Sequence, residues 1–206
     1  MDIDEKARRE QILWYPMRIA YGRAERMKRF QELLNEQNIE NFIVWRDEFQ
    51  PTDDFNVRKE RVPAVNGLIF LHSSRNDITR LKMSRQEFEP MRYYTNRLTD
   101  RLTMKPSDRV LTIPEGQMLN FMSVYNRHED KVGILEYTDF IAKPGKRVRV
   151  TQGDFKNTFG TIKRIKKTQC VVVQLEGFAA LALAFIPPSW LQEITEEEYQ
   201  QAMNQG

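Results

Sequence analysis

The feature of this sequence that most constrains its fold is a change of hydrophobic pattern at Pro144-Gly145. Before this point, short apolar runs alternate with segments whose apolar residues recur every three or four positions, as in amphipathic helices. After it, short β-type runs follow one another between Gly and Asn turns. Four or five such runs within about fifty residues predict a small closed β-barrel. We therefore expect two domains in the 206 residues.

The part before the change predicts an α+β domain with an antiparallel sheet. The expected elements are strands at residues 14–21, 42–45 and 65–71 and helices at residues 24–38, 74–81 and 114–125. Asn38 is the expected stop of the first helix. The Asn66-Gly67 pair predicts a turn or a close backbone approach. The polar segment 49–61 is interpreted as a long hairpin loop.

These patterns set the expected boundaries. Residues 1–11 are a charged N-terminal tail, residues 12–126 the first domain, residues 127–143 a linker, residues 144–195 the barrel, and residues 196–206 an acidic and polar tail. Residues 179–185 have high helix propensity, yet burial in the barrel favours a strand there.

The formal net charge of +3 hides an uneven distribution. Residues 143–167 hold nine Lys or Arg and a single acid, Asp154, so this segment carries +8 and the rest of the chain −5. Such a segment indicates either a polyanionic partner or a solvated polar face. The candidate cations for contacting a nucleic acid are Lys146, Arg147, Arg149, Lys156, Lys163, Arg164, Lys166 and Lys167. Phe155 or Phe159 would be the stacking surface.

The usual motifs of catalysis are missing from the sequence. The two histidines, His72 and His128, and the one cysteine, Cys170, lie in distant segments and do not have the spacing of a zinc site. There is no phosphate loop and no nucleophile elbow. Asp53-Asp54 is interpreted as a solvated turn. We therefore expect a binding protein with no catalytic residue, no metal and no cofactor.

The compartment is expected to be the cytoplasm. The longest apolar run, residues 178–186, has half of the ~18 residues that a membrane span needs. The N-terminus is charged from the start and has no secretory signal. A single cysteine fits a reducing compartment. No membrane partner is expected.

The glycine pattern of the second domain resembles the KOW motif. It combines Val148 and Val150, then Gly153 and Phe155, then Gly160 followed by two isoleucines. Gly153 and Gly160 are expected at positive φ at the two ends of a tight connection. The resemblance implies an SH3-like β-barrel. Some relatives switch this domain to a helical form, but the β-branched residues 171–173 favour an ordinary strand.

The order of motifs resembles the NusG family of transcription elongation factors, in which an NGN domain precedes a KOW barrel. The resemblance covers residues 12–194 and is nearest to the UpxY branch of Bacteroides-type bacteria. The segments that carry it are Val62-Pro63-Ala64-Val65-Asn66-Gly67-Leu68-Ile69-Phe70-Leu71-His72-Ser73-Ser74, Met91-Arg92-Tyr93-Tyr94 and Ala184-Phe185-Ile186-Pro187-Pro188-Ser189.

The resemblance implies that the first domain sits on the clamp helices of RNA polymerase, near the non-template DNA strand. The Phe-Pro-Gly-Tyr turn of the family is here Val65-Asn66-Gly67-Leu68, so both aromatics are lost. The implied polymerase contacts are Trp14, Tyr15, Val65, Leu68 and Phe70. The alternative for Trp14 and Phe70 is the core. Cations that would face DNA or polymerase are Arg18, Arg23, Arg26, Arg92 and Arg97.

The resemblance to the NusG family implies a function in transcription elongation and antitermination. The likeness to the UpxY branch implies that the regulated target is a surface (capsular) polysaccharide operon. The KOW domain would bind nascent RNA, a ribosomal protein or a regulatory factor. Two alternatives stay open. One is a housekeeping NusG-type elongation factor, and the other is an RNA-binding KOW protein of the translation apparatus.

Overall fold

The computed structural model describes residues 7, 9–20, 22–51, 56–99, 106–128, 132–135, 145–165, 168–175, 177–183 and 186–205. The chain divides into two compact units, Met1–Ile113 and Pro114–Gly206, here called unit 1 and unit 2. Both combine helices with antiparallel strands, so the α+β class is confirmed. Among the described residues, no helix is long and apolar enough to cross a membrane.

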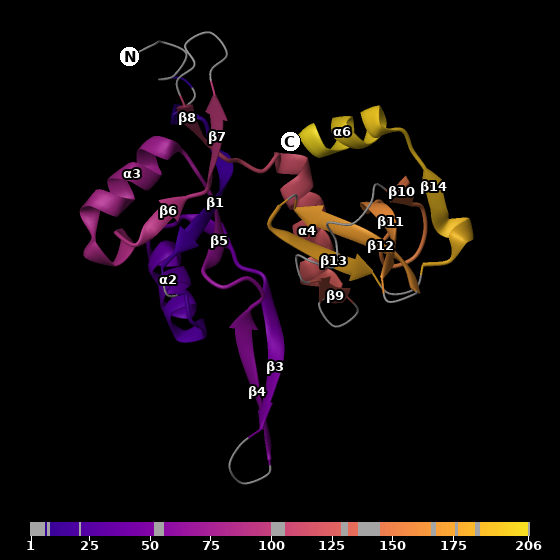
Figure 1. The fold of residues 1–206 in the computed structure, drawn as a ribbon, viewed down its shortest axis with the longest axis horizontal. Helices are drawn as coiled ribbons and strands as arrows, with labels where there is room; N and C mark the ends of the chain where they lie inside the picture. Colours follow the sequence, from indigo (N-terminus) through magenta and orange to yellow (C-terminus); the bar gives the residue numbers. More distant parts are fainter. Residues whose placement is uncertain are drawn as a thin grey trace. The chain divides into compact units, whose positions relative to one another are not determined.

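Unit 1 is built on a four-stranded antiparallel sheet with the order β2-β5-β1-β6 (Figure 1). Its strands are β1 (Leu13–Ile19), β2 (Glu40–Phe42), β5 (Leu68–Ser73) and β6 (Met91–Tyr93). Its helices are α2 (Ala24–Glu36), α3 (Arg75–Ser84) and the short 3-10 helix η1 (Gln86–Phe88). Two separate hairpins complete it, β3 (Trp45–Pro51) with β4 (Val57–Pro63) and β7 (Thr95–Thr99) with β8 (Pro106–Val110).

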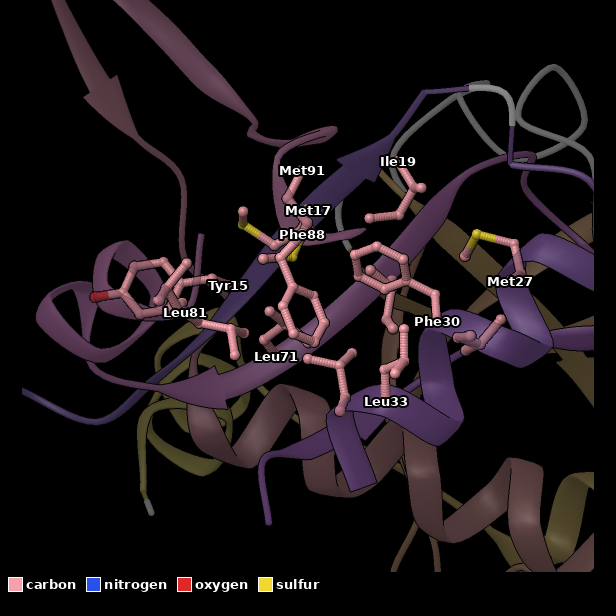
Figure 2. Packing of buried hydrophobic residues seen from close by; sticks show 14 of the residues in the cluster. Tyr15, Met17, Ile19, Met27, Phe30, Leu33, Leu71, Leu81, Phe88 and Met91 are labelled. Carbon is pink, nitrogen blue, oxygen red and sulfur yellow. The ribbon is translucent and has the colours of Figure 1, made fainter. Parts of the chain in front are cut away.

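The core of unit 1 lies between the sheet and its helices (Figure 2). The apolar stripe of α2, with Met27, Phe30 and Leu34 buried, meets the alternate β1 residues Tyr15 and Met17. The chain leaves α2 through Asn38 at φ 54°, a left-handed conformation that asparagine tolerates. The predicted helix stop is therefore confirmed.

The hairpin of β3 and β4 replaces the expected loop. Its strands pair over seven positions, from Trp45↔Pro63 to Pro51↔Val57, and it extends away from the four-stranded sheet (Figure 1). The loop interpretation was wrong because most residues of this ribbon are polar and exposed, so its few apolar residues do not form a buried stripe. Asp53 and Asp54 lie outside the described residues.

Unit 2 contains a six-stranded antiparallel sheet with the order β14-β10-β11-β12-β13-β9. The strands are β9 (Val132–Leu135), β10 (Arg147–Val150), β11 (Phe159–Ile165), β12 (Thr168–Leu175), β13 (Ala179–Leu183) and β14 (Leu191–Glu193). The other elements are α4 (Glu115–His128), η2 (Pro188–Trp190) and α6 (Glu196–Asn204). Among the described strands no pairing joins β9 to β14, so the sheet is open where a closed barrel was expected. β13 confirms the strand preferred over a helix at this segment.

The domain boundaries differ from the prediction at three places. Helix α4, expected at the end of the first domain, belongs to unit 2, where the Asn120 side chain bonds both the N–H and the carbonyl of Phe159. Strand β9 lies inside the predicted linker and pairs with β13. Helix α6 replaces the predicted acidic tail, because Tyr199 and Met203, one turn apart, give it a buried face.

Candidate binding surfaces

The unit 1 sheet has a second face, opposite to its helices. The odd-numbered residues of β1 point into the helix-side core, so the even-numbered ones lie on this second face. The strand register gathers an aromatic group there, here called the aromatic face: Trp14, Phe42, Leu68, Phe70 and His72. The Trp14 and His72 rings stack with centroids 4.7 Å apart, and those of Phe42 and Phe70 lie 6.5 Å apart. Nδ1 of His72 lies 2.7 Å from Oε2 of Glu40.

The five predicted polymerase contacts do not form one exposed surface. Trp14, Leu68 and Phe70 share the aromatic face but are buried, which confirms the core alternative for Trp14 and Phe70. Tyr15 points to the opposite face, into the cluster of Figure 2, because adjacent strand residues alternate. Val65 is the exposed member, at 36 %.

The turn that carries Val65 has a fixed shape. Gly67 has φ +71° and its carbonyl accepts from the Ile19 N–H at 2.7 Å. A Cβ on Gly67 would lie 2.4 Å from the Ile19 carbonyl oxygen, and a Cβ on Gly22 would lie 2.3 Å from Gly67 Cα. Both the turn and the close approach predicted for this position are confirmed. Because the backbone is closely packed at both glycines, the turn that presents Val65 and Asn66 at the surface is held in one conformation.

Under α3, two tyrosines and an arginine form a polar edge of the core. The Tyr15 and Tyr93 rings meet edge to face at 5.8 Å, and the Arg75 guanidinium lies 5.9 Å from the Tyr93 centroid. Burial raises the pKa of Tyr93 to about 12 and also raises the pKa of Tyr15, although the positive charge of Arg75 works against both shifts. Both phenols are therefore neutral at physiological pH.

The structure brings two of the predicted unit 1 cations together. Arg18 and Arg92 are directly opposite each other on β1 and β6, an arrangement that like charges normally disfavour. Nη1 of Arg92 donates to the carbonyls of Glu89 and Met91. Arg23 and Arg26 are exposed at the start of α2. Arg97 belongs to β7, but its side chain lies outside the described part of the molecule.

The predicted cations of unit 2 divide into two groups. Lys146, Arg147 and Arg149 already have partners within the unit. Nζ of Lys146 lies 2.8 Å from Oε2 of Glu193, Arg147 bonds Glu196, and Arg149 donates to Oδ1 of Asn157 at 2.8 Å. Burial and the charge of Arg147 lower the pKa of Lys163. Lys156 and Arg164 are exposed, whereas Lys166 and Lys167 lie outside the described residues.

The predicted glycine turn of unit 2 is confirmed at one of its two glycines. Gly153 has φ +75°, but Gly160 is not at positive φ, and Asn157, at φ 69°, takes that role. Gly160 is needed for space, since a Cβ there would lie 2.6 Å from Cγ1 of Val171. Phe155 is buried and so is not the expected stacking surface. Phe159 is half-buried, with the Arg149 guanidinium 5.7 Å from its ring centroid.

No family model and no curated protein matches this chain. The geometry of the two units is therefore the basis for assigning a function.

Among the described residues, no three His, Cys, Asp or Glu side chains lie close enough to hold a metal ion. Burial raises the pKa of the Cys170 thiol, which makes the thiolate scarcer. The side chain of His128 lies outside the described residues.

Two features were missed by the sequence analysis. Phe49 and Val57 on the β3–β4 hairpin are exposed at 68 % and 65 %, and no apolar periodicity points to them. The acceptor of Arg147, Glu196, lies in the segment interpreted as a tail. The capping sequence Thr195-x-x-Glu198 was a signal that could have located this helix.

Proposed function

We propose that the protein is a transcription elongation and antitermination factor that binds RNA polymerase through unit 1. The observation that carries the proposal is the Val65-Asn66 turn. It corresponds in position to the polymerase-facing turn of NusG-type NGN domains, sharing the glycine at Gly67, and it stands exposed on a backbone held by Gly22 and Gly67. A rigid, exposed turn binds a partner without a large cost of ordering.

The architecture of unit 1 supports this proposal. An antiparallel sheet with a helix layer on one face fits an NGN domain, and Arg18 and Arg92 on adjacent strands offer a site for DNA phosphates. Bound at the polymerase cleft, unit 1 suppresses pausing or termination by keeping the clamp closed. This function needs no catalytic residue, and it is exercised in the cytoplasm.

Unit 2 supplies the second contact of the proposal. Its short antiparallel strands and its positive-φ turn at Gly153 support a KOW-type domain, although the sheet is open where the resemblance implied a closed barrel. The exposed Lys156 and Arg164 suit phosphate contacts with nascent RNA. A ribosomal protein or a regulatory factor is the other proposed partner of this unit.

The target of the proposal is a surface (capsular) polysaccharide operon. Its support is the likeness to the UpxY branch, together with the loss of both aromatics from the turn. The changed turn also argues against a housekeeping NusG-type factor.

The test is in vitro transcription through a pause or terminator downstream of the native leader, combined with co-purification of RNA polymerase. We expect the protein to retain polymerase and increase read-through. Val65→Asp should lose both effects while its circular dichroism stays unchanged, because Val65 is exposed. Met83→Asp, at an 83 % exposed site on α3, is the matched control and should behave as the parent protein. No effect on pausing or read-through on any leader would overturn the proposal.

The second candidate, an RNA-binding protein of the translation apparatus, is favoured by the exposed cations of unit 2 alone. Co-sedimentation with ribosomes, without retention of polymerase, would support it over the first proposal.

A further inference from the structure

The β3–β4 hairpin separates its side chains into two different faces. Its register places Phe49 directly opposite Lys59, with Val57 and Arg61 on the diagonals. Glu48 and Glu60 oppose each other on the other face, where Arg46 pairs with Glu48. Apolar and cationic side chains therefore share one face with a single acid, Asp47, and the two glutamates lie on the other face.

The face of the hairpin that carries Phe49 leaves large apolar side chains exposed to solvent. Phe49 and Val57 are 68 % and 65 % exposed, and Pro51, Lys59 and Arg61 beside them are exposed as well. A two-stranded ribbon is marginally stable in water, and seven paired positions extend it by about 20 Å. Phe49, at the distal part of the ribbon, buries little of its ring, and an exposed aromatic beside a second exposed apolar residue indicates an interaction role.

We propose that this face of the hairpin is a stacking platform for unpaired bases of a single-stranded nucleic acid. The Phe49 ring stacks on a base, and Lys59 and Arg61 contact the adjacent phosphates. An aromatic flanked by cations is the pattern of single-strand binding surfaces, whereas lysine is depleted in the cores of protein–protein interfaces. A duplex hides the faces of its bases, so it is a poorer ligand.

The ion pair on this face does not prevent such a contact. Nζ of Lys59 lies 2.7 Å from Oδ2 of Asp47, and the Lys59 side chain is 60 % exposed. An exposed ion pair of this kind contributes little to stability. Lys59 can therefore exchange the carboxylate for a phosphate at little cost.

The experiment is fluorescence anisotropy of the full-length protein with labelled oligo(dT), oligo(U) and a duplex of the same length. We expect Phe49→Ala and Phe49→Leu to weaken single-strand binding by at least about fivefold. Phe49→Tyr should bind as the parent, because the ring is kept. Lys59→Gln should lower the slope of log affinity against log salt by about one. Met83→Ala, at an apolar site on α3 that is still more exposed, is the control and should change nothing.

Three results would overturn the inference: unchanged binding by Phe49→Ala, parent-like binding by Phe49→Leu, or tighter binding of the duplex. Loss of polymerase retention in Phe49→Ala, with nucleic-acid binding intact, would identify the hairpin as a protein contact and would also overturn it. The inference does not rest on the proposed function, since retention of polymerase and binding of oligonucleotides are measured separately.

Discussion

Arg147 and Glu196 join strand β10 to helix α6. Nε and Nη2 of Arg147 donate to the two carboxylate oxygens of Glu196 at 2.8 and 3.1 Å, and Nη1 donates to Oγ1 of Thr161 at 2.7 Å. The guanidinium also lies 4.0 Å from the Tyr199 ring centroid. A residue predicted to bind RNA therefore holds α6 against β10, and bidentate pairing is the geometry that arginine favours.

The Arg147–Glu196 pair should make stability depend on pH. Hydrogen bonds from Arg147 and Gln200 lower the pKa of Glu196 below its ordinary value of 4.5. The stabilisation is therefore present above about pH 4.5 and is lost as the pH falls through the lowered pKa. We expect Glu196→Gln to cost up to about 1 kcal/mol at pH 7 and to cost nothing once Glu196 is protonated.

Urea unfolding monitored by circular dichroism at pH 7, 5 and 3 checks this prediction. Glu197→Gln removes the adjacent glutamate and should leave the pH profile of the parent unchanged. An equal cost of Glu196→Gln at all three pH values would contradict the prediction.

The same pair predicts which cations of unit 2 bind nucleic acid. Lys156→Gln and Arg164→Gln should each weaken RNA binding and reduce the salt slope by about one, because their exposed side chains reach phosphates. Arg147→Gln should leave the slope unchanged, because Glu196 already holds the guanidinium. Binding isotherms of oligo(U) at several salt concentrations measure the slope. A slope reduced by Arg147→Gln as much as by Lys156→Gln would contradict this assignment.

Helices and strands with one buried apolar face could be predicted from nearby residues in the sequence. The stripe on α2 and the stop at Asn38 depend on nearby residues alone, and both are present in the structure. The strand at β13 required burial to override helix propensity, and it was predicted because its neighbour β12 is rich in valine. Periodicity and turn chemistry are enough for such elements.

Elements determined by distant partners could not be predicted in this way. The β3–β4 ribbon has no buried face to produce a pattern, and the placement of α4 depends on a bond between Asn120 and Phe159. The burial of Trp14 and Phe70 depends on tertiary packing, so their sequence context did not separate core from contact surface. The role of Arg147 depends on Glu196, which is 49 residues away along the chain.

Gly116 allows α4 and α6 to approach closely. A Cβ at this position would lie 2.4 Å from the Ala202 carbonyl oxygen and 2.7 Å from that of Met203, and backbone atoms cannot move aside cheaply. We expect Gly116→Ala to destabilise the protein by about 1–3 kcal/mol, although alanine is the better helix former by about 1 kcal/mol.

Thermal unfolding of the variant checks this prediction. Gly133→Ala is the matched control, because a Cβ there would lie 3.9 Å from its nearest neighbour, in ordinary contact. It should unfold close to the parent temperature. A Gly116→Ala protein at least as stable as the parent would show that the two helices do not touch at this residue.

Gly153 and Gly177 provide a comparison between backbone strain and steric conflict. Both have positive φ, +75° and +81°, but a Cβ on Gly153 would lie 2.4 Å from the Trp190 ring, whereas nothing lies within 4 Å of a Cβ on Gly177. Gly177→Ala should cost about 1–2 kcal/mol from the left-handed conformation alone. Gly153→Ala should cost this amount plus about 1–3 kcal/mol for displacing the indole.

A double-mutant cycle with Trp190→Ala separates the two contributions. In that background the indole is gone, so Gly153→Ala should cost about as much as Gly177→Ala does in the parent. Urea unfolding followed by circular dichroism measures all four free energies without relying on the fluorescence of Trp190. If Gly153→Ala keeps its full cost without the indole, the strain lies in the backbone, and the indole of Trp190 is not what requires glycine at this turn.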